Sequence, residues 1–220
     1  MRTTQTKTTT TTFGIAIGCA IFSCILGGCG DARHSSSTRP STKPTIHVLI
    51  DRSHSTDQAR SFQLNTVKAL HLNLAKNADV HMWAYDNTAV EVIATASDLT
   101  SKQVIRALGT ELSPRNAATK TITRPGAALS AICDKASSGG PMRVFLLTDG
   151  DIDDAADRPV LKKAIGRLAE VASDTSITVI GIDPANRKVW ESTVTPETAH
   201  AITLATWAEA ASAIKRATKG

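Results

Sequence analysis

The chain has 220 residues, of which 41% are hydrophobic and 4% aromatic, and its formal net charge is +5 at pH 7. This size and composition allow one ordinary domain with a single core. Aromatic residues are few and no basic run is interleaved with them, so we expect no nucleic-acid partner. The sequence also lacks the usual nucleotide-binding and zinc-protease motifs.

The N-terminal segment joins positive charge to a short apolar run. Arg2 and Lys7 precede an apolar stretch over residues 13–28, which is shorter than the roughly 20 residues that span a bilayer. The stretch ends in the motif L-G-G-C, which resembles the lipobox of a bacterial lipoprotein signal. The resemblance implies that residues 1–28 are removed and that Cys29 carries a lipid such as palmitate. An uncleaved anchor with a chance cysteine is the alternative.

Residues 29–44 are rich in Ser and Thr and have little to bury, so they predict a flexible, lipidated tether ahead of a domain at 45–220. The domain would then lie on the extracytoplasmic side of a bacterial cell membrane. Loss of residues 1–28 removes two basic residues and no acid, which lowers the net charge from +5 to +3. Cys133 is expected to be a small buried residue.

Continuous apolar runs predict strands that are buried on both faces of a largely parallel sheet. A hairpin around Asp86-Asn87 predicts one antiparallel edge strand, and a last short strand is also expected. In chain order the predicted strands cover residues 46–50, 80–85, 89–95, 144–147, 177–182 and 202–204.

Apolar residues at helical spacing predict helices between these strands. A helix of small residues is also expected after Thr123, and another helix is expected to begin near Ala155. This alternation predicts a doubly wound α/β fold with helices on both faces of the sheet. The residues that carry the helical periodicity are Phe62, Val67, Leu70 and Leu74, then Leu161, Ala164, Ile165, Leu168 and Val171, and finally Trp207, Ala211 and Ile214.

Polar residues alternate directly after the first predicted strand. Asp51, Ser53 and Ser55 form a D-x-S-x-S motif, and a short loop of carboxylate and hydroxyl oxygens suits Mg²⁺, which binds oxygen ligands in a near-octahedral shell. On its own the motif is weak evidence, because Asp and Ser before a helix also serve as N-caps and turn residues.

Two further polar motifs follow later in the chain. Thr123 precedes Gly126 by three residues, and Thr148-Asp149-Gly150 follows the strand predicted at 144–147. In open α/β sheets, ligands bind beyond the carboxyl ends of the strands where the strand order reverses. If the strands that end at Ile50 and Leu147 are neighbours at that point, the loops after them converge.

The three motifs, in this order, resemble the metal-ion-dependent adhesion site of von Willebrand factor A domains, over roughly residues 44–220. The resemblance implies that three hydroxyls touch the metal while two carboxylates act mostly through water. It implies Mg²⁺ as the ion, with Mn²⁺ or Ca²⁺ as alternatives, and a partner protein that offers an Asp or Glu side chain. Thr121 or Thr119 is the alternative to Thr123. The implied metal ligands are Asp51, Ser53, Ser55, Thr123 and Asp149.

Three functions compete at this stage. A metal-dependent adhesion module would be neither an enzyme nor a binder of a small-molecule substrate. A metal-assisted hydrolase of phosphoesters or esters is the second function, and a scaffold that binds no metal is the third. Ser53 and His54 beside Asp51 do not form a catalytic triad, because triad members meet in space rather than along the chain, and the sequence has no G-x-S-x-G motif.

Charged residues flank the proposed ligands. Three basic residues surround Thr123, and they either steer an acidic partner or form a solvated loop surface. Three acids after Asp149 either add a weaker cation site or favour the positive end of the helix expected near Ala155. The basic residues are Arg115, Lys120 and Arg124, and the acids are Asp151, Asp153 and Asp154.

Overall fold

The computed structural model describes residues 43–113, 122–135, 140–171 and 174–219. The predicted signal peptide, the proposed lipidation site Cys29 and the tether up to residue 42 lie outside these residues. Thr119, Thr121, Arg115 and Lys120 do as well. Among the described helices, none has the length and apolar character that a membrane span requires.

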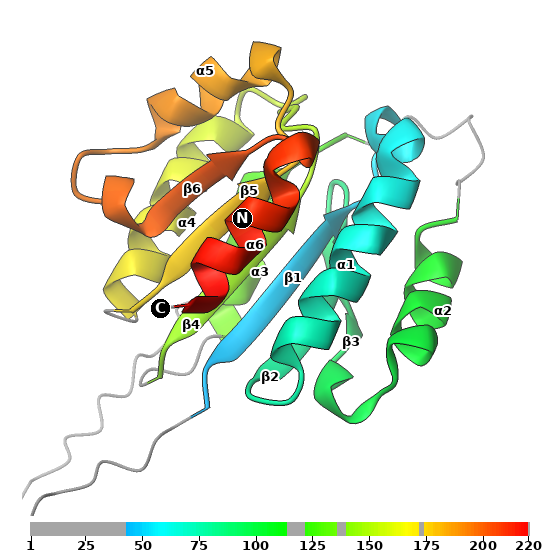
Figure 1. Ribbon diagram of the computed structural model, residues 1–220. Helices are drawn as coiled ribbons and strands as arrows, with labels where there is room; N and C mark the ends of the chain where they lie inside the picture. Colours follow the sequence, from blue (N-terminus) through cyan, green and yellow to red (C-terminus); the bar gives the residue numbers. More distant parts are fainter. Residues whose placement is uncertain (1–42, 114–121, 136–139, 172–173, 220) are drawn as a thin grey trace, which may run out of the picture. The chain divides into compact units, whose positions relative to one another are not determined.

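A six-stranded sheet forms the centre of the domain (Figure 1). Its strand order is β3-β2-β1-β4-β5-β6, with β3 antiparallel to β2 and all other neighbours parallel. The predicted fold class, a mostly parallel sheet with one antiparallel edge strand, is therefore confirmed. The strands are β1 (Thr45–Asp51), β2 (Asp79–Tyr85), β3 (Ala89–Ile93), β4 (Met142–Leu147), β5 (Ser176–Ile180) and β6 (Ile202–Ala205).

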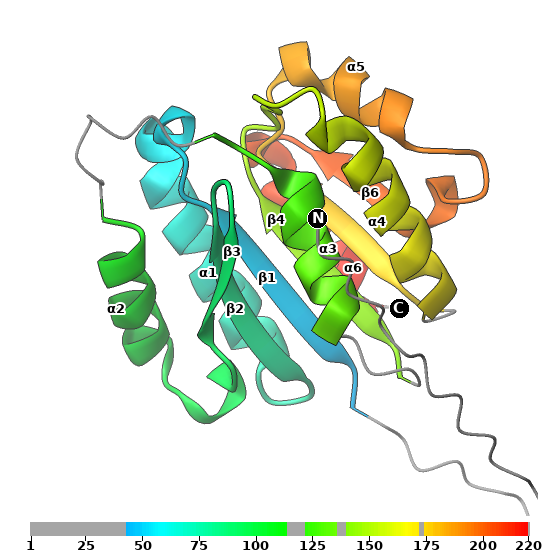
Figure 2. The ribbon, with the colours of Figure 1, turned by 180° about the vertical axis from the view of Figure 1, so that it is seen from behind.

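Helices cover both faces of the sheet (Figures 1 and 2). One hydrophobic cluster joins the sheet to α1 (Arg60–Leu74), α2 (Ser101–Glu111) and α6 (Ala210–Lys219). A second cluster joins the opposite face to α3 (Pro125–Lys135), α4 (Asp157–Val171) and α5 (Pro184–Thr193). Strands buried on both faces explain the uninterrupted apolar runs of the sequence.

Short 3₁₀ turns precede several of these elements. They are η1 (His54–Ala59), η2 (Ala96–Asp98), η3 (Ala199–Ala201) and η4 (Trp207–Glu209). The start of α2 is fixed by a capping box, in which Thr100 and Gln103 bond each other's backbone. Because such a box satisfies N–H groups that a helix start leaves free, it stabilises the first turn of α2.

Only some of the apolar residues that recur at helical spacing in α1 are buried. Val67, Leu70 and Leu74 are buried as expected, but 56% of Phe62 is exposed. Phe62 lies in the first turn of α1, and its ring stacks on Trp207, with 6.2 Å between the ring centroids. The aromatic pair therefore sits at the edge of the packed layer rather than beneath it.

The end of β5 differs from the prediction for a local reason. The strand was expected to reach residue 182 but ends at Ile180, because Gly181 adopts φ 104°, a conformation that favours glycine. The indole of Trp207 also lies so close that a Cβ on Gly181 would be 2.3 Å from it. Both constraints require glycine where the chain leaves the sheet.

Cys133 and His47 are both residues of the core. Cys133 is buried on α3, as predicted. His47 in β1 is also buried, and burial lowers its pKa to about 4. Its Nδ1 accepts a hydrogen bond from Trp83 Nε1 over 3.2 Å, so a neutral ring fits its surroundings.

Candidate metal centre

The reversal of strand order lies between β1 and β4. These two strands are neighbours in the sheet, with Ile50 opposite Leu147. β1 leads to α1 on one face, while β4 leads to α4 on the other. The carboxyl ends of two such strands form the crevice in which α/β sheets bind ligands. The predicted juxtaposition of these two strand ends is confirmed.

Asp51 is fully buried at the end of β1. Its Oδ1 accepts a hydrogen bond from the Ser53 N–H over 2.8 Å, and its Oδ2 accepts one from Thr148 Oγ1 over 2.7 Å. Burial, together with the smaller effect of the nearby charge of Asp149, raises the pKa of Asp51 to about 6, although these hydrogen bonds lower it. A carboxylate held out of water in this way favours a cation nearby.

The backbone of Asp51 is held as firmly as its side chain. Its carbonyl oxygen accepts hydrogen bonds from Thr56 Oγ1, from an Arg60 guanidinium nitrogen and from Gln63 Nε2, at 3.0, 2.9 and 2.9 Å. Gln63 Nε2 also reaches the Leu147 carbonyl at 3.3 Å. Because Gln63 of α1 is hydrogen-bonded to the ends of both central strands, the position at which the loop after β1 begins is fixed.

The two serines of the first motif present their hydroxyls together. Ser53 Oγ and Ser55 Oγ are 3.0 Å apart; Ser53 is 1% exposed, whereas Ser55 is exposed. Ser53 stands at the N-cap of the 3₁₀ turn η1, yet its side chain makes no capping hydrogen bond. The alternative explanation of Ser53 as an ordinary N-cap is therefore unsupported.

Thr123 is fully buried, and its Oγ1 has no hydrogen-bond partner among the described residues. Its backbone N–H donates to Asp153 Oδ2 over 2.8 Å. A buried hydroxyl that lacks a partner costs about 1–3 kcal/mol, so its presence calls for a ligand or another explanation. A bound cation would accept this oxygen as a ligand.

Two of the acids after Asp149 have partners that the sequence did not reveal. The helix expected near Ala155 begins at Asp157, and Asp154 Oδ1 accepts the Ala156 N–H over 2.9 Å just before it, as expected of an acid at a helix start. In addition, Asp153 accepts the Thr123 N–H, and Asp154 forms an ion pair with Arg124 at 2.8 Å. These two acids therefore hold the Thr123 segment in place.

Gly126 explains the spacing of the second motif. A Cβ at this position would lie 2.5 Å from the Leu161 backbone nitrogen, so only glycine lets α3 approach α4 this closely. The Asp157 carboxylate accepts the N–H groups of Gly126 and Ala127 at 2.6 and 3.0 Å. This contact fixes the first turn of α3, which begins two residues after Thr123.

The third motif forms a tight turn beside Asp51. Gly150 has φ 84°, and its N–H donates to Thr148 Oγ1 over 3.0 Å. Its carbonyl accepts a hydrogen bond from Trp190 Nε1 over 2.9 Å. Asp149 is half-buried, and its Oδ1 accepts the Asp151 N–H over 3.1 Å. Thr148, which sequence reasoning treated only as part of the motif, is a direct partner of Asp51.

Arg52 is a second residue that sequence reasoning missed. Its guanidinium forms a buried ion pair with Asp86, with Nε 3.0 Å from Oδ2. The Asp86 carbonyl accepts the Arg124 N–H over 3.0 Å. Arg52 therefore ties the loop after β1 to the β2–β3 turn, which in turn holds the residue that follows Thr123.

The described residues contain no group of three or more His, Cys, Asp or Glu side chains that could hold a metal ion. A divalent cation at this edge would therefore depend on hydroxyls as much as on carboxylates. Asp51, Ser53 and Ser55 are joined by hydrogen bonds, and Asp149 lies close enough to act on Asp51 by its charge. Together with the unpartnered Thr123 hydroxyl, this set fits a hard cation.

Comparisons with known proteins bear on the fold. No protein-family model and no curated protein matches the sequence. Solved structures do match, with sequence identities of 12–18% among six of them. The manganese-loaded TRAP protein of Plasmodium vivax has a TM-score of 0.57 and 17% identity, over 80% of this chain and 73% of that one.

Two further structures are similar. The first is a variant, with multiple mutations to serine, of an aerotolerance-related membrane protein from Bacteroides fragilis, with a TM-score of 0.54 and 16% identity over 80% of this chain and 98% of that one. The second is proximal thread matrix protein 1 of the mussel byssus, with a TM-score of 0.57 and 18% identity over 81% of this chain. This chain spans 48% of the mussel protein.

The fold is a von Willebrand factor A/Rossmann-like α/β fold. The TRAP protein and the Bacteroides protein share this fold type. At these identities the similarity establishes the architecture, so the chemistry of the site rests on the residues of this chain.

Proposed function

We propose that this chain is a divalent-metal-dependent protein-binding module. Ser53, Ser55 and Thr123 would hold Mg²⁺ through their hydroxyls, while Asp51 and Asp149 would support it by charge. The observation that carries this proposal is the buried Thr123 Oγ1 without a described partner, at the same sheet edge as the buried Asp51 carboxylate. The manganese in the TRAP structure supports a divalent ion in this fold.

The charge of the ligand set indicates what the ion would bind. Both carboxylate oxygens of Asp51 already accept hydrogen bonds, from Ser53 and Thr148, so Asp51 is arranged to act on an ion indirectly. A cation bound mainly by neutral hydroxyls keeps most of its charge and would attract a carboxylate from outside. An Asp or Glu side chain of a partner protein is the ligand we propose.

Binding rather than catalysis is the role we propose for these serines. The hydroxyls of Ser53 and Ser55 contact each other, whereas the neighbouring His54 is exposed and its Nδ1 contacts Asp57 at 2.9 Å. Among the described residues, no imidazole is hydrogen-bonded to either hydroxyl. Activation of a serine requires such a base within hydrogen-bond reach.

Calorimetric titration of the purified full chain with Mg²⁺ and Mn²⁺ tests the metal. We expect saturable binding that is lost in Ser53→Ala and in Thr123→Val but kept in Thr123→Ser. An exposed hydroxyl outside the candidate ligand set, that of Ser192 in the last turn of α5, provides the control variant Ser192→Ala. No heat from any ion, together with no thermal shift, would leave only a scaffold.

Chemical crosslinking in intact cells tests the protein partner. We expect one crosslinked protein that disappears with Asp51→Ala or after EDTA and returns with Mg²⁺. The contacting segment of that protein should carry an Asp or Glu whose replacement by Asn or Gln abolishes capture. Crosslinking that persists unchanged in EDTA would contradict a metal-bridged contact.

The membrane location is part of the same proposal. The L-G-G-C motif at 26–29 supports a lipid on Cys29, which would hold the domain on the extracytoplasmic side of the membrane. Labelling of cells with a palmitate analogue should mark the wild-type chain and leave Cys29→Ser unmarked. Equal labelling of both would show that Cys29 is not the lipidated residue.

A further inference from the structure

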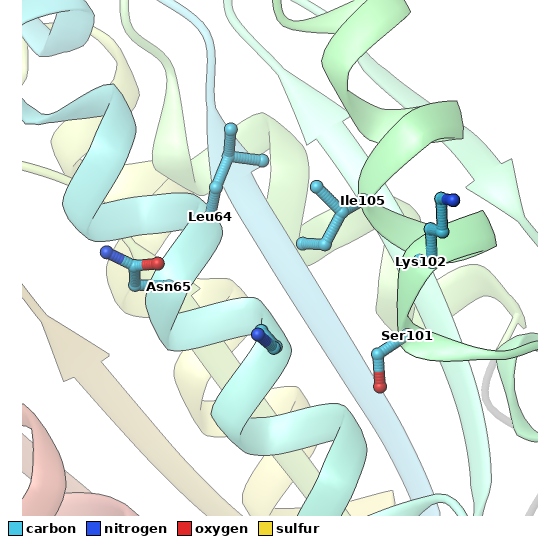
Figure 3. A pocket seen from close by; sticks show the side chains of 6 residues that line it. Leu64, Asn65, Ser101, Lys102 and Ile105 are labelled. Carbon is cyan, nitrogen blue, oxygen red and sulfur yellow. The ribbon is translucent and has the colours of Figure 1, made fainter.

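A groove of about 480 Å³ lies between α1 and α2. Figure 3 shows Leu64 of α1 and Ile105 of α2 pointing toward one another across it. Pockets that hold small ligands have volumes of roughly 300–1,000 Å³, so the groove is large enough for one. Its lining residues are Leu64, Asn65, Lys68, Ser101, Lys102 and Ile105, all distinct from the candidate metal ligands.

Contacts of His71 fix the position of α2, which forms one wall of the groove. His71 of α1 is buried, and its Nδ1 lies 2.8 Å from Ser101 Oγ while its Nε2 lies 2.9 Å from the Ala96 carbonyl. These contacts hold the first turn of α2 against α1. Because the capping box of Thr100 also fixes that turn, the separation of the two helices is set by the fold.

The two charged residues that line the groove, Lys68 and Lys102, are both basic. α1 contains no Asp or Glu, and the single acid of α2, Glu111, contacts Arg52. Lys68 and Lys102 are both exposed and form no ion pair with any described residue. Lysine ammonium groups on long flexible stems can turn toward a bound anion.

The length of the groove restricts its occupant. Leu64 and Lys68 are four residues apart on α1, which corresponds to about 6 Å along a helix axis. A docked protein helix would contact several turns, whereas this groove offers about one. A small ligand therefore fits better than an acidic helix.

From these observations we infer that the α1–α2 groove binds an anionic amphiphile, that is, a phosphate or carboxylate head on a short apolar body. The head lies between Lys68 and Lys102, with the Ser101 hydroxyl beside them. The apolar body lies between Leu64 and Ile105. This site is independent of the metal, because none of its residues belongs to the candidate ligand set.

Titration of the purified full chain with dihexanoyl phosphatidic acid, a soluble short-chain lipid, tests the site. We expect saturable binding that is unchanged by EDTA and at least about tenfold weaker in Lys68→Ala/Lys102→Ala, because two charge-assisted contacts are lost. The matched control, Lys162→Ala/Lys188→Ala, removes the same charge from exposed positions of α4 and α5 and should bind as the wild type does. Equal binding by both double variants would overturn the inference.

Two further probes separate the parts of the ligand and its source. Inorganic phosphate should bind at least about tenfold more weakly than the lipid, because it lacks the apolar body; equal affinity would overturn the amphiphile. Phosphatidylglycerol vesicles that bind the wild type better than the Lys68/Lys102 variant would identify a membrane lipid, whereas binding of the soluble lipid alone would identify a free amphiphile. Binding of an acidic peptide but of neither lipid would refute the inference.

Discussion

Thr148 Oγ1 donates a hydrogen bond of 2.7 Å to Asp51 Oδ2, between residues that are 97 positions apart in the chain. The bond joins the loops after β4 and β1 where the strand order reverses. It also occupies one oxygen of the buried carboxylate at the centre of the candidate metal site. The consequences of this arrangement for stability and metal binding can be measured.

Thr123→Val should have opposite effects with and without metal. Removal of the buried hydroxyl should stabilise the metal-free chain by about 1–3 kcal/mol, because its desolvation is no longer uncompensated. The same variant should lose the stabilisation that Mg²⁺ gives the wild type. Urea denaturation in EDTA and in Mg²⁺ measures both effects. Thr123→Ser, which keeps the oxygen, is the control, and an equal response to Mg²⁺ in wild type and Thr123→Val would contradict the assignment of Thr123.

Asp51 should make the metal-free chain less stable as the pH rises. Burial raises its pKa from 3.8 to about 6, so the folded state holds the proton more tightly than the unfolded state does. The resulting stabilisation is fully present below pH 3.8 and is lost as the pH rises through 6, which amounts to roughly 3 kcal/mol.

The difference in unfolding free energy between wild type and Asp51→Asn, measured in EDTA from pH 4 to 7.5, isolates this effect. The wild type should lose stability relative to the variant across that interval, and Mg²⁺ should restore it at pH 7.5. A difference that stays constant with pH would show that Asp51 has the same pKa in both states.

Gly126→Ala should destabilise the domain, because a Cβ there would lie 2.5 Å from the Leu161 nitrogen and 2.9 Å from Asp157 Oδ1. Forced separation of α3 and α4 should cost about 1–3 kcal/mol or more, and Mg²⁺ affinity should fall because Thr123 moves with α3. The control is Gly109→Ala in α2, where no atom lies within 4 Å of the new Cβ. That change should stabilise by about 0.5–1 kcal/mol, as thermal unfolding can show. Similar effects of the two substitutions would exclude close helix packing as the reason for Gly126.

Arg52→Met should be strongly destabilising. Its side chain is 5% exposed and that of Asp86 1% exposed, and loss of one member of a buried pair typically costs about 3–5 kcal/mol. Arg187→Met removes a cation from an exposed pair with Glu191, whose side chains are 43% and 57% exposed, and should cost no more than about 1 kcal/mol. Chemical denaturation distinguishes the two, and a small effect at Arg52 would mean that its contact with Asp86 contributes little.

Much of the fold follows from the sequence because the determining signals are local. Apolar runs without interruption identify β1, β4 and β5 as strands covered on both faces, and the turn at Asp86-Asn87 identifies the hairpin. Strand ends are less predictable, since β5 ends where Gly181 adopts a positive φ and Trp207 packs against it. The contact with Trp207 joins distant parts of the chain and leaves no local signal.

In the candidate site, too, local features can be predicted from the sequence and tertiary contacts cannot. The D-x-S-x-S pattern pointed to Asp51, Ser53 and Ser55, although Ser55 lies in the 3₁₀ turn η1 rather than in an extended segment. Arg52, between them, pairs with Asp86, a contact that the motif does not reveal. Asp153 was expected either to add a weaker cation site or to favour a helix start, and it also binds the Thr123 backbone. Such a partner is chosen by the tertiary fold.

The central position of β1, between β2 and β4, has a consequence for synthesis of the protein. A nascent chain that ends before β4 contains the D-x-S-x-S loop but lacks the strand that completes its surroundings. Contacts between such distant segments form late and at high entropic cost. Metal binding would therefore require the complete sheet. A cation that binds only this state would stabilise it relative to the incompletely folded chain.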